Sequence, residues 1–570
     1  MKSGLREPRT SADNAEPGFP YPKPLIMVVA AVILLPLLFY TLSLLRIMAA
    51  TAAFPWELDQ GEGHNVWSAW LLMQGRGPYL NLNHYPFFDI NYPPFHFVLM
   101  IPLLGVFGPS LLAGRLLADL CVFGLAAAVG AIVWRYSGRN RLATGLAVLL
   151  VLANPYIYIF GVIATVNVSQ VMLGTWGLYF LGRALDRVEP DGTVVPAPQI
   201  NRRYFIAGLV FLLAAIYTKQ QAIDAVATGF LFLLWRRPKL AVISGLIFGA
   251  TGGGLFLLID WITAHQFYIN LIEVNINTFI KRQLLDQWLA YGMTHAPLLL
   301  LAGGYAWQTA RQKARLSLWL VYLITTTLGS VLVGKFGAAE TYFYSSIAAV
   351  AIAAGLFTGD VLKGKLIRPD LNFPRFIKPG TIAPPATAEP GLPKAPGTGR
   401  IDFRTAITSL VVVLLVLQNV IFYHTPETPH PWKNYIKGHS GNFVLFGTFP
   451  TEQERQAGQR IADMVKAAPP PVLTEEASFA MVNGYEVVTN PSNILVYNQA
   501  GLWQGQELEQ MVKNRCFSLM ILHGHFLPDF IQVQMRANYT LALEEKLPGG
   551  IYEVWQRSQP RANPGGCFGK

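Results

Sequence analysis

The sequence predicts a polytopic α-helical membrane protein with a small C-terminal α/β domain, and three observations support this fold class. Of the 570 residues, 52% are hydrophobic and only 14% are charged, whereas a soluble domain carries about 25% charged residues. Long apolar runs recur along the chain as far as residue 423. Lys and Arg, which outnumber Asp and Glu by 44 to 33, stand between these runs. That placement is typical of membrane topology and argues against a nucleic-acid partner.

The apolar runs predict about eleven membrane-spanning helices. Loops on one side, together with the N-terminal tail, hold 25 Lys and Arg, whereas the alternate loops hold five. Positive residues accumulate on the cytoplasmic side, so we expect a multi-pass plasma-membrane protein with a cytoplasmic N-terminus, in contact with membrane lipids. An odd number of spans places the C-terminal segment outside. The expected spans are 24–50, 110–134, 142–159, 169–186, 204–218, 221–235, 240–264, 291–310, 316–333, 345–362 and 404–423.

The expected domains follow from this map. They are a cytoplasmic tail (1–23), a transmembrane bundle (24–362) with a long first outer loop (51–109), a proline-rich cytoplasmic linker (363–403), a last span (404–423) and an extracytoplasmic α/β domain (424–570).

The C-terminal segment alternates helical and strand-like patterns, which is typical of a small α/β domain. Helices are expected over 451–467 and 506–513, and strands over 471–474, 517–522 and 551–555. Cys516 and Cys567 could form at most one disulfide. His523 and His525 could mimic a ligand pair, but a surface turn is favoured because no third ligand is apparent.

The first outer loop carries the most informative residues. Three carboxylates, Glu57, Asp59 and Glu62, follow directly on the first span. Carboxylates at a membrane face are costly to desolvate and usually have a function. Helical spacing predicts a helix lying on the membrane over 66–73. Tyr92-Pro93-Pro94 opens a second apolar helix, 95–107, which we interpret as interfacial or re-entrant.

Several motifs lie in order along the first 360 residues. They are the acidic motif with Asp59 and Glu62, Tyr92-Pro93-Pro94, Phe107-Gly108-Pro109-Ser110, Ala113-Gly114-Arg115-Leu116, Tyr217-Thr218-Lys219-Gln220, and the block 337–343 with Glu340 and Tyr342. In order and spacing they resemble the GT-C membrane glycosyltransferases, particularly the aminoarabinose-transferase and protein O-mannosyltransferase branch. Many members have adjacent Asp-Glu where this chain has Asp59-Gln60, which leaves the second carboxylate open between Glu57 and Glu62.

The resemblance implies an enzyme that moves a sugar from a polyprenyl phosphate or pyrophosphate carrier to an acceptor hydroxyl of a lipid, glycan or protein on the outer side. Asp59 is then the general base that takes the acceptor proton. Glu62 would share a helical face with Asp59 and could raise its pKa, orient it or join it in binding Mg²⁺ or Mn²⁺. Glu57 flanks Asp59 on the other side. The structural alternative for these acids is solvation at the headgroup level.

The leaving phosphate needs cations at the outer face. Lys219, Lys335 and Arg115 are the candidates for donor phosphate binding. For Lys219 the alternative is snorkelling from a short helix, and for Arg115 it is an ion pair with Asp119 four residues further along the helix. The residues expected to line the substrate site are Asp89 (or a loop cap), Tyr92, Gln220, Glu340 and Tyr342.

Two other functional classes compete with a glycosyltransferase. A transporter or flippase of a lipid-linked or anionic substrate predicts charged residues at the bilayer midplane and internal repeats. Here the ionisable residues gather at one face, and no repeat is evident. A non-enzymatic envelope scaffold would leave the acidic first loop unexplained.

Overall fold

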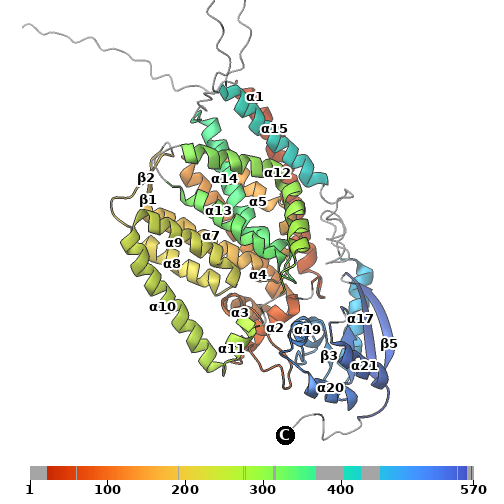
Figure 1. Cartoon of the computed structure of the whole chain (residues 1–570). Coiled ribbons are helices and arrows are strands. Elements are labelled where there is room, and N and C mark those ends of the chain that lie inside the picture. Colours follow the sequence, from red (N-terminus) through yellow and green to blue (C-terminus); the bar gives the residue numbers. More distant parts are fainter. Residues whose placement is uncertain are drawn as a thin grey trace, which may run out of the picture.

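The protein is mostly helical, with a long bundle and a smaller mixed domain at one end (Figure 1). The structure, a computed structural model, describes residues 22–59, 61–190, 192–273, 275, 278–311, 316–366, 403–424, 450–524, 526–548, 550–561 and 567.

Helices occupy all eleven ranges that the sequence predicts as spans. They are α1 (Lys23–Ala52), α4 (Leu111–Tyr136), α5 (Arg141–Leu152) with α6 (Pro155–Phe160), α7 (Asn167–Leu185), α8 (Arg202–Ile216), α9 (Ile223–Arg236), α10 (Pro238–Ile262), α12 (Lys281–Arg311), α13 (Leu318–Gly329), α14 (Tyr344–Leu362) and α15 (Phe403–His424). Five helices of the described chain are long and apolar enough to cross a membrane, namely α1, α4, α10, α14 with the preceding turn, and α15. The number of spans therefore stays a prediction.

Two of the predicted ranges differ from the helices observed. The range 142–159 is broken at Asn154, whose side chain caps α6 by accepting from the Tyr156 N–H. Helix α12 begins at Lys281, ten residues before the expected span. Short helices join the long ones at the end of the bundle that faces the mixed domain: η1 (Gln220–Ala222), α11 (Gln266–Tyr268), η2 (Ile269–Glu273), η3 (Ser330–Gly334) and η4 (Glu340–Phe343). At the other end, β1 (Asp186–Val188) and β2 (Val194–Pro196) form a hairpin.

The bundle has a buried centre and exposed edges. Helix α14 is its most enclosed long helix, and small residues over Ala348–Ala354 let neighbouring helices approach it closely. Helices α1 and α15 lie side by side along one edge (Figure 1), where Asn419 donates to the Ile33 carbonyl. Helix α10 lies at the opposite edge and buries only Ala241 and Ser244.

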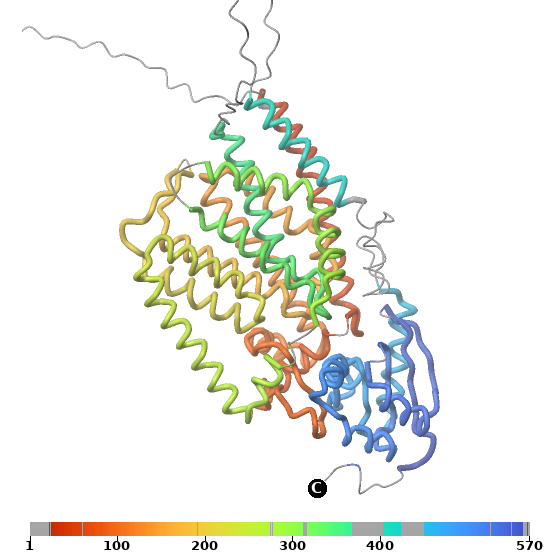
Figure 2. Tube along the Cα trace, viewed as in Figure 1, coloured from red at the N-terminus to blue at the C-terminus, as the bar shows by residue number. Residues whose placement is uncertain are grey.

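The first loop contributes helices α2 (Glu62–Met73) and α3 (Phe95–Phe107), and α3 has the predicted bounds. Helix α2 begins at Glu62, four residues before the predicted start. It packs against α3, α4 and the C-terminal domain, and most of its residues are buried. The prediction that it lies on the membrane is thus not supported by its packing. Figure 2 shows the loop between the bundle and the C-terminal domain.

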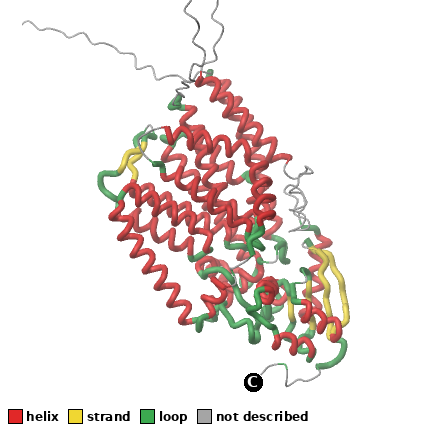
Figure 3. Tube along the Cα trace, viewed as in Figure 1, coloured by secondary structure: helices red, strands yellow, loops and turns green. Residues whose placement is uncertain are grey.

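The C-terminal segment contains both helices and strands (Figure 3). Its sheet has the order β3-β4-β6-β5, with β3 parallel to β4 and the other pairs antiparallel. The strands are β3 (Leu473–Thr474), β4 (Leu519–Leu522), β5 (Tyr539–Leu547) and β6 (Gly550–Arg557). The helices are α17 (Glu452–Ala467), α18 (Ala477–Met481), α19 (Pro491–Gln499), α20 (Gln506–Lys513) and α21 (Asp529–Asn538). The sequence pattern did not reveal β5, α18, α19 or α21.

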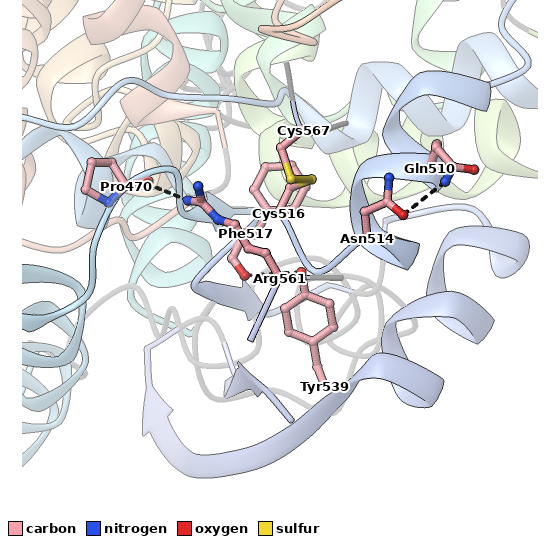
Figure 4. The surroundings of a disulfide bond; sticks show 8 residues. All are labelled: Pro470, Gln510, Asn514, Cys516, Phe517, Tyr539, Arg561 and Cys567. Carbon is pink, nitrogen blue, oxygen red and sulfur yellow. Dashed lines mark hydrogen bonds between the residues drawn. A yellow bond between two sulfur atoms is a disulfide. The ribbon is translucent and has the colours of Figure 1, made fainter. Parts of the chain in front are cut away.

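A disulfide between Cys516 and Cys567 fastens the end of the chain to this domain (Figure 4). The predicted tail lies almost entirely outside the described residues, as does most of the predicted linker, beyond residue 366. The domain meets the first loop directly. The Trp56 ring stacks on Phe479 with 5.2 Å between ring centres, and its Nε1–H donates to the Arg455 carbonyl.

Candidate active site

Arg115 is fully buried near the start of α4, where it fixes the segment between α1 and α2. Its Nη1 donates to the carbonyls of Thr51 and Phe54, and its Nη2 to that of Trp56. Nε and Nη2 also hold the two carboxylate oxygens of Glu62 at 2.8 and 2.6 Å. A guanidinium has five N–H donors, and all five are used. Arg115 therefore has no donor left for a phosphate, and its candidate role in donor binding was wrong.

Glu62 is equally saturated. Besides Arg115, its carboxylate accepts the backbone N–H of Leu58 at 2.8 Å and of Ala164 at 2.9 Å. Each oxygen thus has two donors, in a side chain that is fully buried. Glu62 holds the turn that carries Asp59, and no lone pair is left for a metal ion. The predicted metal pair of Asp59 and Glu62 does not fit this geometry. Among the described residues, no group of three His, Cys, Asp or Glu could hold a metal ion.

Glu57 turns toward the C-terminal domain. Its Oε1 accepts the Ser478 N–H at 2.8 Å, and its carboxyl group is hydrogen-bonded to that of Glu476. Burial, and then the neighbouring Glu476, raises the pKa of Glu57 well above its usual range. A Cβ on Gly63 would lie 2.2 Å from Glu57 Oε1. Only glycine at this position therefore allows α2 to lie this close to the Glu57 carboxylate. Glu57 is therefore a contact between domains, not a second catalytic carboxylate.

Asp59 differs from both flanking acids because its carboxylate has few hydrogen-bond partners within the described part of the chain. The side chain is half-buried and accepts the N–H of Gly61. Burial, and then the charge of Glu62, raises the pKa of Asp59 to about 6. Tyr92, Glu340, Glu476 and His523 all lie within electrostatic range of this carboxylate. Asp59 is thus the carboxylate that several segments of the chain approach.

Lys219 is the buried cation of the same region. It lies between α8 and η1, and its side chain is inside the protein, so the snorkelling alternative was wrong. Nζ donates to Asn167 Oδ1 at 2.6 Å and lies 4.8 Å from the ring centre of Tyr342 and 5.7 Å from that of Tyr92. Burial, and then Lys335, lowers the pKa of Lys219 to about 7.

Lys335 lies close enough to Lys219 to affect it. Its Nζ donates to the Asn275 carbonyl at 2.8 Å, and its side chain is half-buried. Gln283 holds this loop by donating to the carbonyls of Val333, Lys335 and Ala338. Lys219 and Lys335 thus lie near each other, and Tyr92, beside Lys219, is also within electrostatic range of Asp59. Two neighbouring cations are suited to an anionic group.

Comparison with known proteins identifies the fold. No protein-family model and no curated protein sequence matches the chain. Two crystal structures of ArnT from Cupriavidus metallidurans match at a TM-score of 0.52 and 14% identity. The match to the apo structure covers 93% of this chain and 98% of the ArnT chain. The match to the structure bound to undecaprenyl phosphate covers 95% of this chain and 100% of the ArnT chain. An oligosaccharyltransferase from Archaeoglobus fulgidus matches at a TM-score of 0.48 and 10% identity, over 93% of this chain and 74% of that one.

The chain has the GT-C fold. The resemblance drawn from its motifs is thus confirmed at the level of the fold.

Within the GT-C fold, four further residues named from the sequence take different places. Tyr92 and Tyr342 flank Lys219. Glu340 is buried in η4, with an Oε2 atom that has no partner among the described residues. Gln220 donates to the carbonyls of Asn91 and Leu271 and so joins two loops instead of offering its amide to a ligand.

Asp89 belongs to the domain interface. It is fully buried and accepts from Asn493 of α19 at 3.0 Å, while its carbonyl accepts from Asn490. Burial raises the pKa of Asp89 to about 7. The substrate-lining role predicted for it has no support in these contacts, since the side chain is enclosed by the C-terminal domain.

Three residues of this region were missed as members of the site. Asn167 holds Lys219, and Glu476 meets both Glu57 and His523. His523 is half-buried against Glu476 and Tyr552, so the predicted surface turn is only partly right; His525 lies outside the described residues. The tandem Glu475-Glu476 after a predicted strand was the one local signal available. Nothing local marks Asn167.

Proposed function

We propose that this protein is an integral-membrane glycosyltransferase that moves a sugar from a polyprenyl-phosphate-linked donor to an acceptor hydroxyl on the extracytoplasmic face. The observation that carries the proposal is one site with two unsaturated charges. The Asp59 carboxylate and the Lys219 ammonium both approach Tyr92, and each has few hydrogen-bond partners among the residues that the structure describes. The likeness in fold to ArnT, one structure of which is bound to undecaprenyl phosphate, supports this class of donor.

Asp59 acts as the general base. A carboxylate with a pKa of about 6 is ionised at neutral pH, yet it is more basic than an ordinary Asp. It takes the proton of the acceptor hydroxyl as that oxygen forms a bond to the anomeric carbon. The bond from the anomeric carbon to the phosphate oxygen breaks, and its electron pair leaves with the phosphate.

Lys219 and Lys335 receive the phosphate. Negative charge accumulates on the leaving oxygen, and positive charge in a water-poor site stabilises it strongly. Because the pKa of Lys219 is about 7, an arriving phosphate would favour its protonated form. Asn167 and the two tyrosine rings keep the ammonium in place. Arg115 and Glu62 take no part in the chemistry and hold the segment that bears Asp59.

The C-terminal domain is proposed to lie outside the cell membrane, with the N-terminus in the cytoplasm. The surplus of Lys and Arg in alternate loops supports this orientation. The Cys516–Cys567 disulfide adds independent support, because structural disulfides persist in oxidising compartments. The acceptor, whether lipid, glycan or protein, would approach from that side.

The test is a transfer assay. Purified protein would be incubated with a panel of radiolabelled polyprenyl-phosphate sugars and membrane acceptors, with Asp59→Asn as the inactive control. We expect transfer from at least one donor by the wild-type protein and none above background by the variant. The proposal fails if no donor is turned over or bound, and the assignment of the base fails if Asp59→Asn transfers sugar at the wild-type rate.

A further inference from the structure

A cavity of about 330 Å³ lies between helices α1, α5, α14 and α15. Its walls are almost entirely apolar, formed by residues such as Ile33 of α1, Leu146 of α5, Val361 of α14 and Val411 of α15. An apolar cavity of about 150 Å³ stays free of water and already binds benzene. This larger cavity is therefore suited to a hydrocarbon chain.

The cavity reaches the lateral surface of the bundle. Leu25 of α1 and Val413 of α15 line it, and they are 43% and 59% exposed. Helices α1 and α15 are both long and apolar enough to cross a membrane. In a bilayer, the hydrocarbon next to these residues is lipid, so a lipid chain can enter the cavity from the side.

The cavity lies near the starts of α1 and α15, at the end of the bundle that is remote from the C-terminal domain (Figure 2). Beyond Leu415, the last lining residue of α15, Asn419 joins the two helices. Its side chain donates to the Ile33 carbonyl, and its own carbonyl accepts from the Tyr40 hydroxyl. These bonds fasten the helices on the side of the cavity nearer the C-terminal domain. In the proposed orientation, the cavity lies in the cytoplasmic leaflet.

Two arginines stand at the starts of the helices that line the cavity. Arg404 lies one turn before the lining residue Thr408 on α15, and Arg141 directly precedes the lining residue Leu142 on α5. Of the five N–H donors of a guanidinium, Arg404 uses Nη2 for its one hydrogen bond among the described residues, to the Gly364 carbonyl at 2.9 Å. The Arg141 side chain is exposed. Basic pockets between transmembrane helices on the cytoplasmic side are suited to anionic lipid headgroups.

Thr358 of α14 supplies a polar group one turn before the end of this wall, at Leu362. It lines the cavity and is only 8% exposed, and its Oγ1 has no hydrogen-bond partner within the described part of the chain. A buried hydroxyl without a partner is costly. The ester carbonyl of a glycerophospholipid can accept from it, whereas a polyprenyl chain has no oxygen to offer. Asp360, the one acid of α14, does not line the cavity and accepts from Gln308 of α12.

We propose that this cavity binds an acyl chain of an anionic glycerophospholipid from the cytoplasmic leaflet. The ester carbonyl accepts from Thr358, and the phosphate lies between Arg404 and Arg141. The chain fills the space that α1 and α15 share with α5 and α14, so the lipid holds α15 against the bundle. The site is separate from the region of Asp59 and Lys219, and the inference does not depend on the transfer reaction.

The experiment measures the unfolding temperature of the full-length protein, freed of lipid in detergent, against the concentration of added lipid. The lipids are phosphatidylglycerol, phosphatidylcholine with the same acyl chains, and a polyprenyl phosphate. Each basic residue near an anionic headgroup strengthens binding by about fivefold. We therefore expect phosphatidylglycerol to bind at least about fivefold more tightly than phosphatidylcholine.

Variants with matched controls locate the effect. Ala30→Phe fills the cavity and should abolish the response to phosphatidylglycerol, whereas Ala406→Phe, at an exposed position of α15 outside the lining, should keep it. Arg404→Met should weaken binding about fivefold, whereas Arg237→Met, which also removes one hydrogen bond to a carbonyl, should not. Thr358→Val should weaken binding about two- to tenfold. Arg404→Met and Thr358→Val add no bulk, so they test the site even if Ala30→Phe does not fold.

Three results would overturn the inference. Equal responses of Ala30→Phe and Ala406→Phe, or wild-type affinity in both Arg404→Met and Thr358→Val, would place the lipid elsewhere. Equal affinity for phosphatidylglycerol and phosphatidylcholine would exclude a site for an anionic headgroup. If polyprenyl phosphate stabilises Ala406→Phe but not Ala30→Phe, the cavity holds the tail of the sugar donor instead. The proposed function is tested separately, by the transfer assay.

Discussion

The cluster around Arg115 and the region around Asp59 and Lys219 both contain buried or half-buried charges, but they differ in how many hydrogen-bond partners these charges have. Arg115 and Glu62 are completely buried, and every donor and acceptor site of the pair is occupied. Among the described residues, Asp59 and Lys219 have one or two partners each. We call the first the arginine cluster and the second the open site. A saturated charge holds the backbone, whereas an unsaturated one remains available to a substrate.

The comparison also explains why Asp59 and Glu62, which belong to one acidic motif, have different roles. Burying a charge is costly unless it is paired and hydrogen-bonded. The arginine cluster meets that condition within the protein. In the open site the condition would be met only when a sugar phosphate and an acceptor arrive. The differences between these regions can be tested separately through stability and through activity.

The largest effect is expected from breaking the arginine cluster. Arg115→Met leaves the Glu62 carboxylate buried without its partner, which typically costs about 3–5 kcal/mol. We expect a large fall in the unfolding temperature in detergent and loss of activity along with it. The matched control is Arg76→Met, which removes an exposed pair with Glu486 and should cost less than about 1 kcal/mol. Equal stability of the two variants would contradict the structural role of Arg115.

The opposite result is expected in the open site. Asp59→Asn removes the base and should lower kcat at least about 100-fold, while the unfolding temperature stays close to that of the wild-type protein. The wild-type rate should rise with pH through about 6 and then level off, because Asp59 must be ionised to accept a proton. A pH–rate profile measures the effect on activity, and thermal unfolding measures the effect on stability. A rate that is flat from pH 5 to 8 would rule out Asp59 as the titrating base.

Sequence alone predicted the parts of this comparison that depend on neighbouring residues. Apolar runs placed the helices, and the local motifs singled out Asp59 and Lys219. The saturation of Arg115 and Glu62 could not be foreseen, because their contact joins residues 53 positions apart. Glu57 was likewise taken for a catalytic candidate, since its partner Ser478 lies 421 residues away. Which charge is saturated is a property of tertiary contacts, and motif spacing does not contain it.

An intermediate effect is expected for Lys219→Met. A hydrogen bond to a charged group contributes roughly 1.5–3 kcal/mol, so donor affinity should fall about 10- to 100-fold with little change in stability. Wild-type affinity should also weaken as pH rises through about 7, because the neutral amine no longer attracts the phosphate. Binding of a labelled polyprenyl-phosphate sugar measures both effects. Lys281→Met, at an exposed lysine that begins α12, is the control and should bind like the wild-type protein.

The smallest effect is expected where the open site meets the C-terminal domain. The pKa of Glu476 is raised to about 7, mainly by burial, and burial together with Glu476 also raises the pKa of Glu57. A raised pKa means that the folded state prefers the protonated form. Its contribution to stability is therefore complete below the ordinary glutamate pKa and is lost as pH rises through about 7. The wild-type unfolding temperature should fall across this interval.

Glu476→Gln should weaken that dependence. The amide can donate to Glu57 without titrating, so docking of the domain would persist at higher pH. We expect the difference between wild-type protein and variant to reach about 1 kcal/mol, or roughly 2–4 °C, at pH 8 and to vanish near pH 5. Thermal unfolding at a series of pH values measures it. Parallel curves for the two proteins would mean that Glu57 and Glu476 do not share a proton.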